Sequence, residues 1–355
     1  MNDNAKPRRP PSARDVAGVA DVSVSTVSLV LNGKAAERGI PEATTQRVLK
    51  AVKQVGYRPN AMAAGLRRQT SDTIGFISDL IATTPHAGPM IQGAQDAAWE
   101  AQKILIIVNT GDERSVQDRA IEMMLQRQVE GFVYATMYHR FVELPAVLRE
   151  YPSVLLDCRS DNTTISSVAP DEQSGAIAAA EHLLSAGHRR IGYLQTNARI
   201  PAATERLEGF KTALQARGVD FDPQLVATGI DEFSGGFETA SHLLDLPEPP
   251  SALVCFNDRM AAGAFRAAHR RGMIIPRDLS VAGFDNEELV SLFTDPALTT
   301  VQLPHYEMGY WAVSNLLGQI AGQDNGSVQH RVACPLVVRE SVAFPGTDQQ
   351  SRNGN

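Results

Sequence analysis

The sequence predicts a small all-α N-terminal domain followed by a larger α/β body made of two doubly wound subdomains. Two short apolar helical patterns on either side of a turn indicate the helical domain. From residue 73 onward, short β-rich runs alternate with amphipathic helical patterns, which is typical of parallel sheets covered by helices. At 355 residues, the chain is long enough for two or three domains.

The charge also changes sign along the chain. Residues 1–68 contain 12 Lys or Arg and 5 Asp or Glu, whereas the remainder contains 21 basic and 35 acidic residues. A basic segment joined to an acidic body is typical of a nucleic-acid-binding module on a regulatory domain. A solvated basic helix surface would give the same imbalance, so charge alone leaves both interpretations open.

The first helix is expected to begin after Ser12, a good N-cap residue, with Asp15 in the first turn, where the helix dipole favours an acid. The spacing predicts a buried stripe of Val16, Val19 and Ala20. Asp21 would then begin the turn that leads into the second helix.

The second helix is expected to follow Ser23, which can serve as its N-cap. The residues that should face the core are Val27, Val30 and Leu31. The opposite side should expose Ser25, Ser28 and Leu29, with Val24 and Thr26 beside the N-terminal end. In a major groove, such apolar groups can contact thymine methyls while the hydroxyls bond phosphates or base edges. The alternative is a small helical bundle with single exposed apolar residues, but the helix-turn-helix spacing and basic charge favour DNA reading.

A third helix is expected from Pro41 to Val55 and should end at Gly56. Its core-facing residues are expected to be Val48, Ala51, Val52 and Val55. Next, Asn60 can cap a short segment from Ala61 to Arg67, which contains Gly65 and is too short to hold as a helix alone. We therefore expect this segment to order only when another interaction offsets the entropy cost.

The body contains eight strand candidates and six clear helical patterns. The strands are expected at 73–78, 104–108, 131–135, 153–157, 189–195, 224–228, 252–256 and 279–284. The helices are expected at 89–102, 115–128, 172–186, 204–217, 235–245 and 258–271. So many units favour two subdomains over one compact sheet.

Polar residues follow most of these strands, where open parallel sheets bind their ligands. They are Asp79, Asn109, Asp157, Asn257, Asp258 and Asp285. Any single one of them can equally cap the following helix, but the cluster as a whole is better explained by a ligand-binding cleft.

Several protein classes are disfavoured by the sequence. No apolar run approaches the roughly 20 residues of a membrane span, and the N-terminus lacks the apolar region of a secretory signal. The three cysteines, Cys158, Cys255 and Cys334, are far apart, which favours reduced thiols in a cytoplasm over a disulfide framework or a metal site. Walker, GxGxxG, HExxH, CxxC and nucleophile-elbow motifs are missing, so we expect no enzyme activity, no cofactor and no metal.

The segments "DVAGVADVSVSTVSLVLNG" and "YRPNAMAAGLRR" closely resemble the LacI/GalR family of bacterial transcription regulators, over essentially the whole chain from Ala13 to about Phe344. The resemblance implies that the second helix reads the major groove and that a hinge helix orders on the operator. The implied DNA-binding residues are Ser23, Val24, Ser25, Thr26, Ser28, Leu29, Asn32, Asn60, Ala63 and Leu66. Leu66 would be the wedge in the minor groove.

The motifs "GHRRIGYL", "ERLEGF", "FNDRMAAGAFRAAHRRGMIIPRDLSVAGFDN", "PALTTV" and "LVVRES" resemble the effector-binding core of the same family. That core is similar to periplasmic sugar-binding proteins, with two Rossmann-like lobes joined by three crossovers. The implied effector contacts are Arg206, Asn257 and Asp285, with Phe233 stacking on the ligand and His86 and His305 as further contacts. Either histidine can equally be an ordinary surface residue.

The resemblance gives a fold class and approximate domain boundaries. The fold is an all-α helix-turn-helix domain at 1–58, a hinge helix and linker at 59–71, and an α/β periplasmic-binding-protein-like body of two Rossmann-like subdomains at 72–345. Within the body, we expect an N-subdomain at 72–169 plus 301–333 and a C-subdomain at 170–300 plus 334–345. Residues 346–355 are expected to form a disordered tail without leucine heptads.

The expected function is that of a cytoplasmic, ligand-responsive DNA-binding regulator, a repressor of carbohydrate-utilisation genes that binds a palindromic operator as a homodimer. Its effector is expected to be a neutral sugar, because Arg206 is the one basic residue that we assign to the cleft; a sugar phosphate and a purine or nucleoside are the alternatives. A stand-alone solute-binding protein or an enzyme on the same fold is the alternative class, which residues 13–68 disfavour.

Overall fold

The computed structural model describes residue 9 and residues 11–58, 70–80, 87–111, 113–323 and 326–345, apart from the side chains of 137 and 138. The chain divides into two compact units, Met1–Ser71 and Asp72–Asn355, which are called the head and the body below. The predicted hinge residues Asn60, Ala63 and Leu66, the loop residue His86 and the predicted tail at 346–355 lie outside the described residues.

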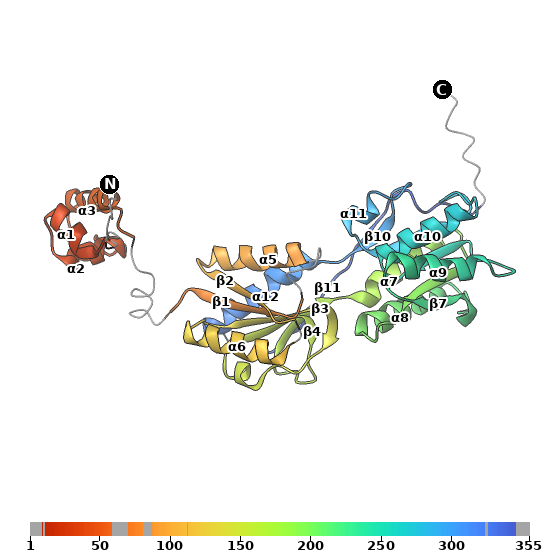
Figure 1. The fold of residues 1–355 in the computed structure, drawn as a ribbon, viewed down its shortest axis with the longest axis horizontal. Helices are drawn as coiled ribbons and strands as arrows, with labels where there is room; N and C mark the ends of the chain where they lie inside the picture. The colour runs from red at the N-terminus through yellow and green to blue at the C-terminus, as the bar shows by residue number, and fades with distance from the viewer. Residues whose placement is uncertain are drawn as a thin grey trace, which may run out of the picture. The chain divides into compact units, whose positions relative to one another are not determined.

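The head contains three helices: α1 (Ala13–Ala20), α2 (Val24–Leu31) and α3 (Glu42–Val55) (Figure 1). The backbone N–H of Ser12 donates to the Asp15 carboxylate at 2.7 Å, which fixes the start of α1. Asp21 ends α1 in the left-handed conformation, and Gly56 ends α3 in the same way.

The core of the head differs from the predicted one at one position. Its buried residues are Val16, Ala17, Ala20, Val27, Val30, Val48 and Ala51, with Leu31, Val52 and Val55 packed against them. Val19 is 49% exposed, so its predicted burial is wrong. Successive helical residues are about 100° apart, so the buried arc of this short helix runs from Val16 through Ala20 to Ala17, and Val19 lies about 60° outside it, next to Val16.

The first lobe of the body is built on a six-stranded parallel sheet in the order β11-β5-β4-β3-β1-β2. Its strands are β1 (Thr73–Ser78), β2 (Ile104–Asn109), β3 (Phe132–Phe141), β4 (Ser153–Arg159), β5 (Ser166–Pro170) and β11 (Gln329–Val332). Helices α5 (Ala87–Glu100) and α12 (His305–Ile320) cover one face, and α6 (Arg114–Gln126) with the 3-10 helix η2 (Ala146–Glu150) covers the other (Figure 1). The apolar side chains that these helices bury against the two faces of the sheet form the core of the first lobe.

The second lobe has a six-stranded sheet in the order β12-β10-β9-β8-β6-β7, parallel except where β12 meets β10. Its strands are β6 (Ile191–Thr196), β7 (Val226–Gly229), β8 (Ala252–Cys255), β9 (Ser280–Asp285), β10 (Thr299–Gln302) and β12 (Leu336–Val337). Its helices are α7 (Glu172–Ser185), α8 (Pro201–Ala216), α9 (Phe233–Leu244), α10 (Asp258–Arg270) and the short α11 (Glu288–Ser291), and a 3-10 turn, η3 (Pro223–Leu225), precedes β7.

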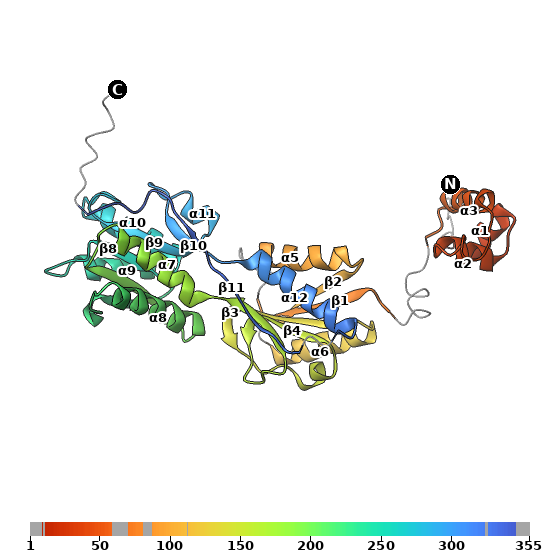
Figure 2. The ribbon, with the colours of Figure 1, turned by 180° about the vertical axis from the view of Figure 1, so that it is seen from behind.

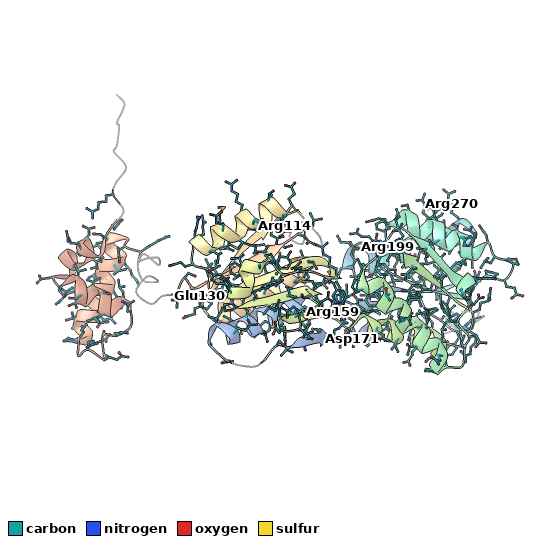
Figure 3. All side chains as sticks on the ribbon, turned by 90° about the horizontal axis from the view of Figure 1, so that it is seen from below. Arg114, Glu130, Arg159, Asp171, Arg199 and Arg270 are labelled. Atoms are coloured by element: carbon teal, nitrogen blue, oxygen red, sulfur yellow. The ribbon has the colours of Figure 1, made fainter. Side chains whose placement is uncertain are left out.

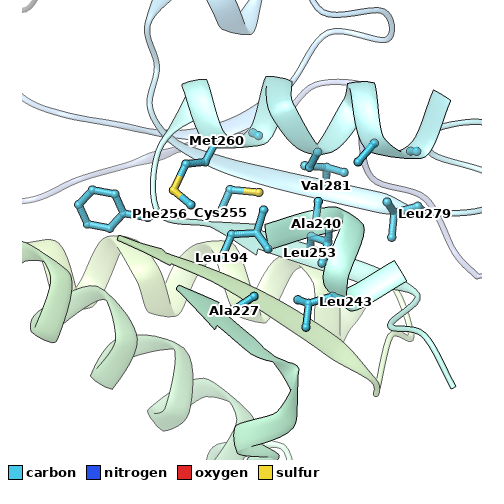
Figure 4. Packing of buried hydrophobic residues seen from close by; sticks show 14 of the residues in the cluster. Leu194, Ala227, Ala240, Leu243, Leu253, Cys255, Phe256, Met260, Leu279 and Val281 are labelled. Carbon is cyan, nitrogen blue, oxygen red and sulfur yellow. The ribbon is translucent and has the colours of Figure 1, made fainter. Parts of the chain in front are cut away.

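The two faces of this second sheet carry separate apolar clusters. Helices α7 and α8 cover one face, and α9 and α10 cover the other (Figure 2). Figure 4 shows how Leu194 and Leu253, from neighbouring strands, pack with Leu243 of α9 and Met260 of α10. Because the lobe is packed on both faces, functional residues are left to the ends of the strands.

The chain crosses between the lobes three times: from β5 to α7, from β10 to α12 and from β11 to β12. β10 extends to Gln302, so this crossover lies about two residues beyond the expected subdomain boundary at 301. The strands β5, β10, β11 and β12 and the helix α12 were not among the predicted elements. Within the described residues, no helix is both long and apolar enough to span a membrane.

Candidate functional site

Helix α2 exposes only part of the surface that the sequence predicts: Ser25 is exposed, whereas Ser28 and Leu29, expected to be exposed, are half-buried against the rest of the head. Ser23 caps the helix, and its Oγ accepts a hydrogen bond from the Thr26 backbone N–H at 3.1 Å. Val24 is 44% exposed and Ser25 is exposed, whereas Thr26 and Leu29 are half-buried. The N-terminal end of α2 therefore offers an apolar group and hydroxyls to a partner.

The C-terminal end of α2 is tied by side-chain contacts. Asn32 is exposed, and its Nδ2 donates to the Ser28 carbonyl at 2.6 Å and to the half-buried Ser28 Oγ at 3.2 Å. A residue that the sequence analysis did not single out, Arg47 of α3, donates from Nε to the Ala20 carbonyl at 2.9 Å. This bond joins α3 to the end of α1, just before the turn that orients α2.

In the body, Arg206 of α8 is the most heavily bonded of the predicted effector residues. Its Nε donates to Glu172 Oε2 at 2.7 Å, and its Nη1 donates to the Phe256 carbonyl at 2.5 Å and to Asp285 Oδ1 at 3.3 Å. The guanidinium carbon lies 3.7 Å from the ring centroid of Phe284 and 4.6 Å from that of Phe256. Arg206 is 4% exposed, so its charge is held by carboxylates and aromatic rings inside the lobe.

Glu172, the first residue of α7, is the partner that the sequence analysis missed. It is 2% exposed and accepts two hydrogen bonds from Arg206. Burial raises the pKa of the Glu172 carboxyl, and the Arg206 charge opposes this rise. Burial works to lower the pKa of the Arg206 guanidinium, but the charges of Glu172 and Asp285 outweigh it and raise that pKa overall.

Asp285, at the end of β9, lies next to Arg206 and accepts a hydrogen bond from it. Its backbone has a φ of 107°, in the region that favours glycine, so the site holds it in a strained conformation. Its neighbour in the lobe, Asp258, is fully buried and accepts bonds from Thr300 Oγ1 at 2.5 Å and from the Glu287 backbone N–H at 2.8 Å. Asp258 therefore braces the turn after β9, on which Asp285 stands.

The first lobe contributes Asp157, whose carboxyl feels the charges of Glu172, Arg206 and Asp285 across the junction. Asp157 is 5% exposed, and its Oδ1 has no hydrogen-bond partner in the described structure. Burial, with Glu172 as the next contributor, raises the pKa of Asp157 well above its usual range. A raised pKa favours the protonated carboxyl, which can donate a hydrogen bond as well as accept one.

The other predicted effector residues occupy less central positions. Asn257 caps α10: its Oδ1 accepts from the Met260 backbone N–H at 2.8 Å, and its Nδ2 donates to the Asp231 carbonyl at 2.8 Å. The first of these bonds is that of a helix N-cap, which is the alternative role that the sequence leaves open for Asn257. Phe233 begins α9 and is 49% exposed, while His305 is the half-buried first residue of α12.

A groove of about 810 Å³ lies along the ends of β6 and β7 and the start of α8. Thr196, Asn197, Thr204 and Glu205 line it from the second lobe, and Phe141 from the end of β3 lines it from the first. Hydroxyl and amide groups facing an aromatic ring are suited to a polar ligand with an apolar face.

Comparisons with known proteins identify the family. Residues 12–60 match the family model described as bacterial regulatory proteins, lacI family, and residues 180–342 match a periplasmic binding protein-like domain. The chain is 33% identical over 333 residues to the HTH-type transcriptional repressor CytR of Escherichia coli (strain K12), across 93% of this chain and 95% of that protein. The chain belongs to the lacI family of bacterial regulatory proteins.

Two further relatives extend this result. The HTH-type transcriptional regulator GalS of Salmonella typhimurium (strain LT2) is 35% identical over 332 residues, covering 93% of this chain and 96% of GalS. The crystal structure of the lac repressor dimer bound to operator and an anti-inducer matches with a TM-score of 0.79 and 26% identity, over 94% of this chain and all of that one. The predicted family and fold class are confirmed, and the lacI-family protein is a DNA-binding transcriptional regulator, not an enzyme.

Proposed function

We propose that this lacI-family regulator is a repressor that binds a palindromic operator as a homodimer and responds to a neutral, hydroxylated effector held between its lobes. Acting on chromosomal DNA, it works in the cytoplasm. We further propose carbohydrate-utilisation genes as its targets, because the site chemistry described next suits a sugar.

The observation that carries the effector class is the charge balance around Arg206. Its guanidinium is already shared between Glu172 and Asp285, and Asp157 adds another carboxyl within electrostatic range. A phosphate in this site would meet two carboxylates, Glu172 and Asp285, that already share the one guanidinium, whereas sugar hydroxyls can donate to Asp285 and exchange hydrogen bonds with the Asp157 carboxyl. We therefore favour a neutral sugar over a sugar phosphate, with a nucleoside as the second candidate because its ribose offers similar hydroxyls.

Relatives support the same class. One lacI-family regulator from Enterococcus faecium was solved with bound ribose, and the regulator CelR was solved as a cellobiose complex, each 26% identical to this chain. We propose Arg206, Asp285, Asn257, Phe233 and His305 as effector contacts in this chain, to which the structure adds Asp157 as a candidate. His86 stays a proposal from the sequence alone.

For DNA, we propose that α2 enters the major groove with its N-terminal end. The exposed Val24 and the neighbouring hydroxyls support this orientation, because they can contact thymine methyls and phosphates together. The proposed contacts are Ser23, Val24, Ser25, Thr26, Ser28, Leu29 and Asn32, together with Asn60, Ala63 and Leu66 of the segment that follows the head.

Dimerisation is supported by large apolar side chains on the surface of the body. Leu289, Leu292 and Phe293 are 76%, 52% and 79% exposed on and after α11, and Trp99 of α5 is 71% exposed. An apolar interface shared by two copies of the chain would explain why these side chains are exposed. The matched lac repressor structure is a dimer, which supports this explanation.

The test combines DNA selection with calorimetry. We expect the full chain to select a palindromic site from random DNA, to elute as a dimer in light scattering, and to bind a neutral mono- or disaccharide. The ligand panel should include a nucleoside and the matching sugar phosphates. Binding of a sugar phosphate more tightly than its unphosphorylated sugar would contradict the proposed effector class, and a monomer that selects no site would contradict the repressor mechanism.

A further inference from the structure

Glu205 of α8 reaches across to the first lobe and meets two arginines there. Arg331 of β11 binds it with both ends of its guanidinium, Nη1 to Oε2 at 3.0 Å and Nη2 to Oε1 at 3.0 Å. Arg159 of β4 donates from Nη2 to the same Oε1. All three side chains are partly buried, between 21% and 32% exposed, so water screens their charges less than at an open surface.

Arg331 places this contact at the hinge between the two lobes, which is formed by the crossovers. Arg331 is the next-to-last residue of β11, directly before the crossover to β12. Its Nη1 also donates to the carbonyl of Pro170 at 2.7 Å, and Pro170 is the last residue of β5, directly before the crossover to α7. Figure 3 shows Arg159 and Asp171, the residue after Pro170, at the junction of the two lobes. The cluster therefore ties α8 to two of the three crossover strands.

A buried histidine of the first lobe orients the side chain of Arg159. His139 of β3 is 1% exposed, and its Nε2 accepts from Arg159 Nε at 2.7 Å. Arg159 also lies over the ring of Phe141, with 5.4 Å between its guanidinium carbon and the ring centroid. Since His139 accepts at Nε2, its neutral ring carries the proton on Nδ1, which lies 4.0 Å from Glu205 Oε2. Contacts within the first lobe thus orient Arg159 independently of Glu205.

We propose that Glu205, Arg159 and Arg331 form a hinge clamp that sets the angle between the lobes without help from a ligand. Glu205 directly precedes Arg206 in α8, so any rotation that opens the clamp also moves the arginine that holds Asp285. A paired guanidinium–carboxylate contact tolerates only a few tenths of an ångström of stretch before its hydrogen bonds are lost. The clamp is therefore a two-state element, closed or open, that both the effector site and the hinge can bias.

The proposal rests on the proposed regulatory function only for its last step, the link to DNA. The first arm of the test needs neither DNA nor effector: amide hydrogen exchange of the full chain, comparing wild type with Glu205→Gln. We expect exchange to rise about fivefold or more in segments 200–206 and 329–332, while the core of α10 is unchanged. The matched control is Glu208→Gln, which removes the same charge from the same helix but only breaks an exposed pair with Lys211.

The second arm measures coupling. We expect the factor by which an effector changes operator affinity to fall toward 1 in Glu205→Gln, from a wild-type value on the order of 5–150. A charge exchange, Glu205→Arg with Arg159→Glu, should restore part of the exchange protection that Glu205→Gln loses. If Glu205→Gln does not fold, Arg331→Lys keeps the charge but loses the paired bonds, and it should show the same pattern.

The outcomes are separable. Equal exchange in Glu205→Gln and Glu208→Gln would overturn the clamp, whatever the protein does on DNA. Increased exchange with unchanged coupling would overturn the link from the clamp to regulation. Failure of the wild type to bind any operator would instead count against the proposed function, and hydrogen exchange alone would then decide whether the clamp exists.

Discussion

Arg206 and Glu172 form a two-point ion pair in which both side chains are almost wholly buried, at 5% and 2% exposure. The distances are 2.7 Å from Nε to Oε2 and 3.3 Å from Nη2 to Oε1. The pair joins the first residue of α7, directly after a crossover, to α8, and it positions the guanidinium that holds Asp285. The proposed effector site thus rests on an internal ion pair, in which the guanidinium of Arg206 is shared with a second carboxylate, Asp285.

Breaking this pair should be costly. Glu172→Gln leaves a buried guanidinium with less compensation, so we expect the free energy of unfolding in urea to fall by about 3–5 kcal/mol. Glu208→Gln, on the surface of α8, should change it by less than about 1 kcal/mol. Replacing both partners, with Glu172→Leu and Arg206→Met, should recover part of the loss because the buried guanidinium is removed with its partner, although Asp285 then loses its bond to Arg206. A loss equal to that of the Glu208 variant would show that the pair is not the structural centre of the site.

His139 should make stability depend on pH in mildly acidic solution. Burial, aided by the Arg159 charge and opposed by Glu205, lowers the pKa of His139 to about 3. Between the unfolded pKa near 6.5 and that value, the unfolded chain binds a proton that the folded chain does not. The histidine's contribution is therefore fully present above pH 6.5, and it should fall by up to about 1.4 kcal/mol per pH unit below it.

The variant His139→Gln tests this, because a glutamine oxygen can still accept from Arg159 and has no proton to gain. We expect the unfolding free energies of wild type and variant to run parallel above pH 7 and to converge or cross as the pH falls from 6.5 to 5. His242, on α9, supplies the control substitution His242→Gln. Parallel curves for wild type and His139→Gln down to pH 5 would mean that His139 is protonated in the folded protein.

Much of the body could be predicted because its strands are continuous apolar runs, such as 73–78 and 153–157, that lie in the middle of a sheet. The elements that were missed have weaker signals. β5 reads Ser-Ser-Val-Ala-Pro, and β11 and β12 are short strands at the sheet edges. α12 returns to the first lobe from a crossover, so its place in the fold depends on topology rather than on local pattern.

The same distinction applies to the site. Arg206 and Asp285 could be found because they lie in motifs, "ERLEGF" and "GFDN". Glu172 could not, since an acid in the first turn of a helix is expected from the helix dipole alone. Glu205 lies in the same motif as Arg206, but nothing in the sequence distinguishes it from an ordinary solvent-facing acid of a helix. Their partners, Arg206, Arg159 and Arg331, are 34, 46 and 126 residues away, and only the fold brings them together.

Leu29 should affect sequence recognition more than general DNA binding. We expect Leu29→Ala to weaken binding to the preferred operator by about 1–3 kcal/mol, with a much smaller effect on random DNA, because a methyl contact reads a base. Leu49→Ala, at a partly exposed leucine of α3, is the matched control. The measurement is a mobility shift on both DNAs at one salt concentration. An equal loss on both DNAs would assign Leu29 to the packing of the head instead.

Asp285 should connect the effector to the DNA response. Its Oδ1 accepts from Arg206, and the left-handed backbone at the end of β9 directs it away from regular strand geometry. Asp285→Ala removes the acceptor, so we expect effector binding and the effector's influence on operator affinity to be lost together, while operator affinity without effector stays nearly unchanged. Asp285→Asn keeps an oxygen for Arg206 and should lose only the charge-assisted part of effector binding, about 1.5–3 kcal/mol. Asp278→Asn, an exposed aspartate paired with Arg277 in the same lobe, should leave both quantities unchanged.

The coupling has a built-in check, because the effector and the operator must change each other's affinity by the same factor. Calorimetry of the effector with and without operator DNA, and DNA titrations with and without effector, should therefore give equal factors for wild type and a factor near 1 for Asp285→Ala. If the alanine variant still responds to the effector, the ligand binds away from Asp285. The ion pair of Arg206 and Glu172 would then stabilise the lobe without forming part of the effector site.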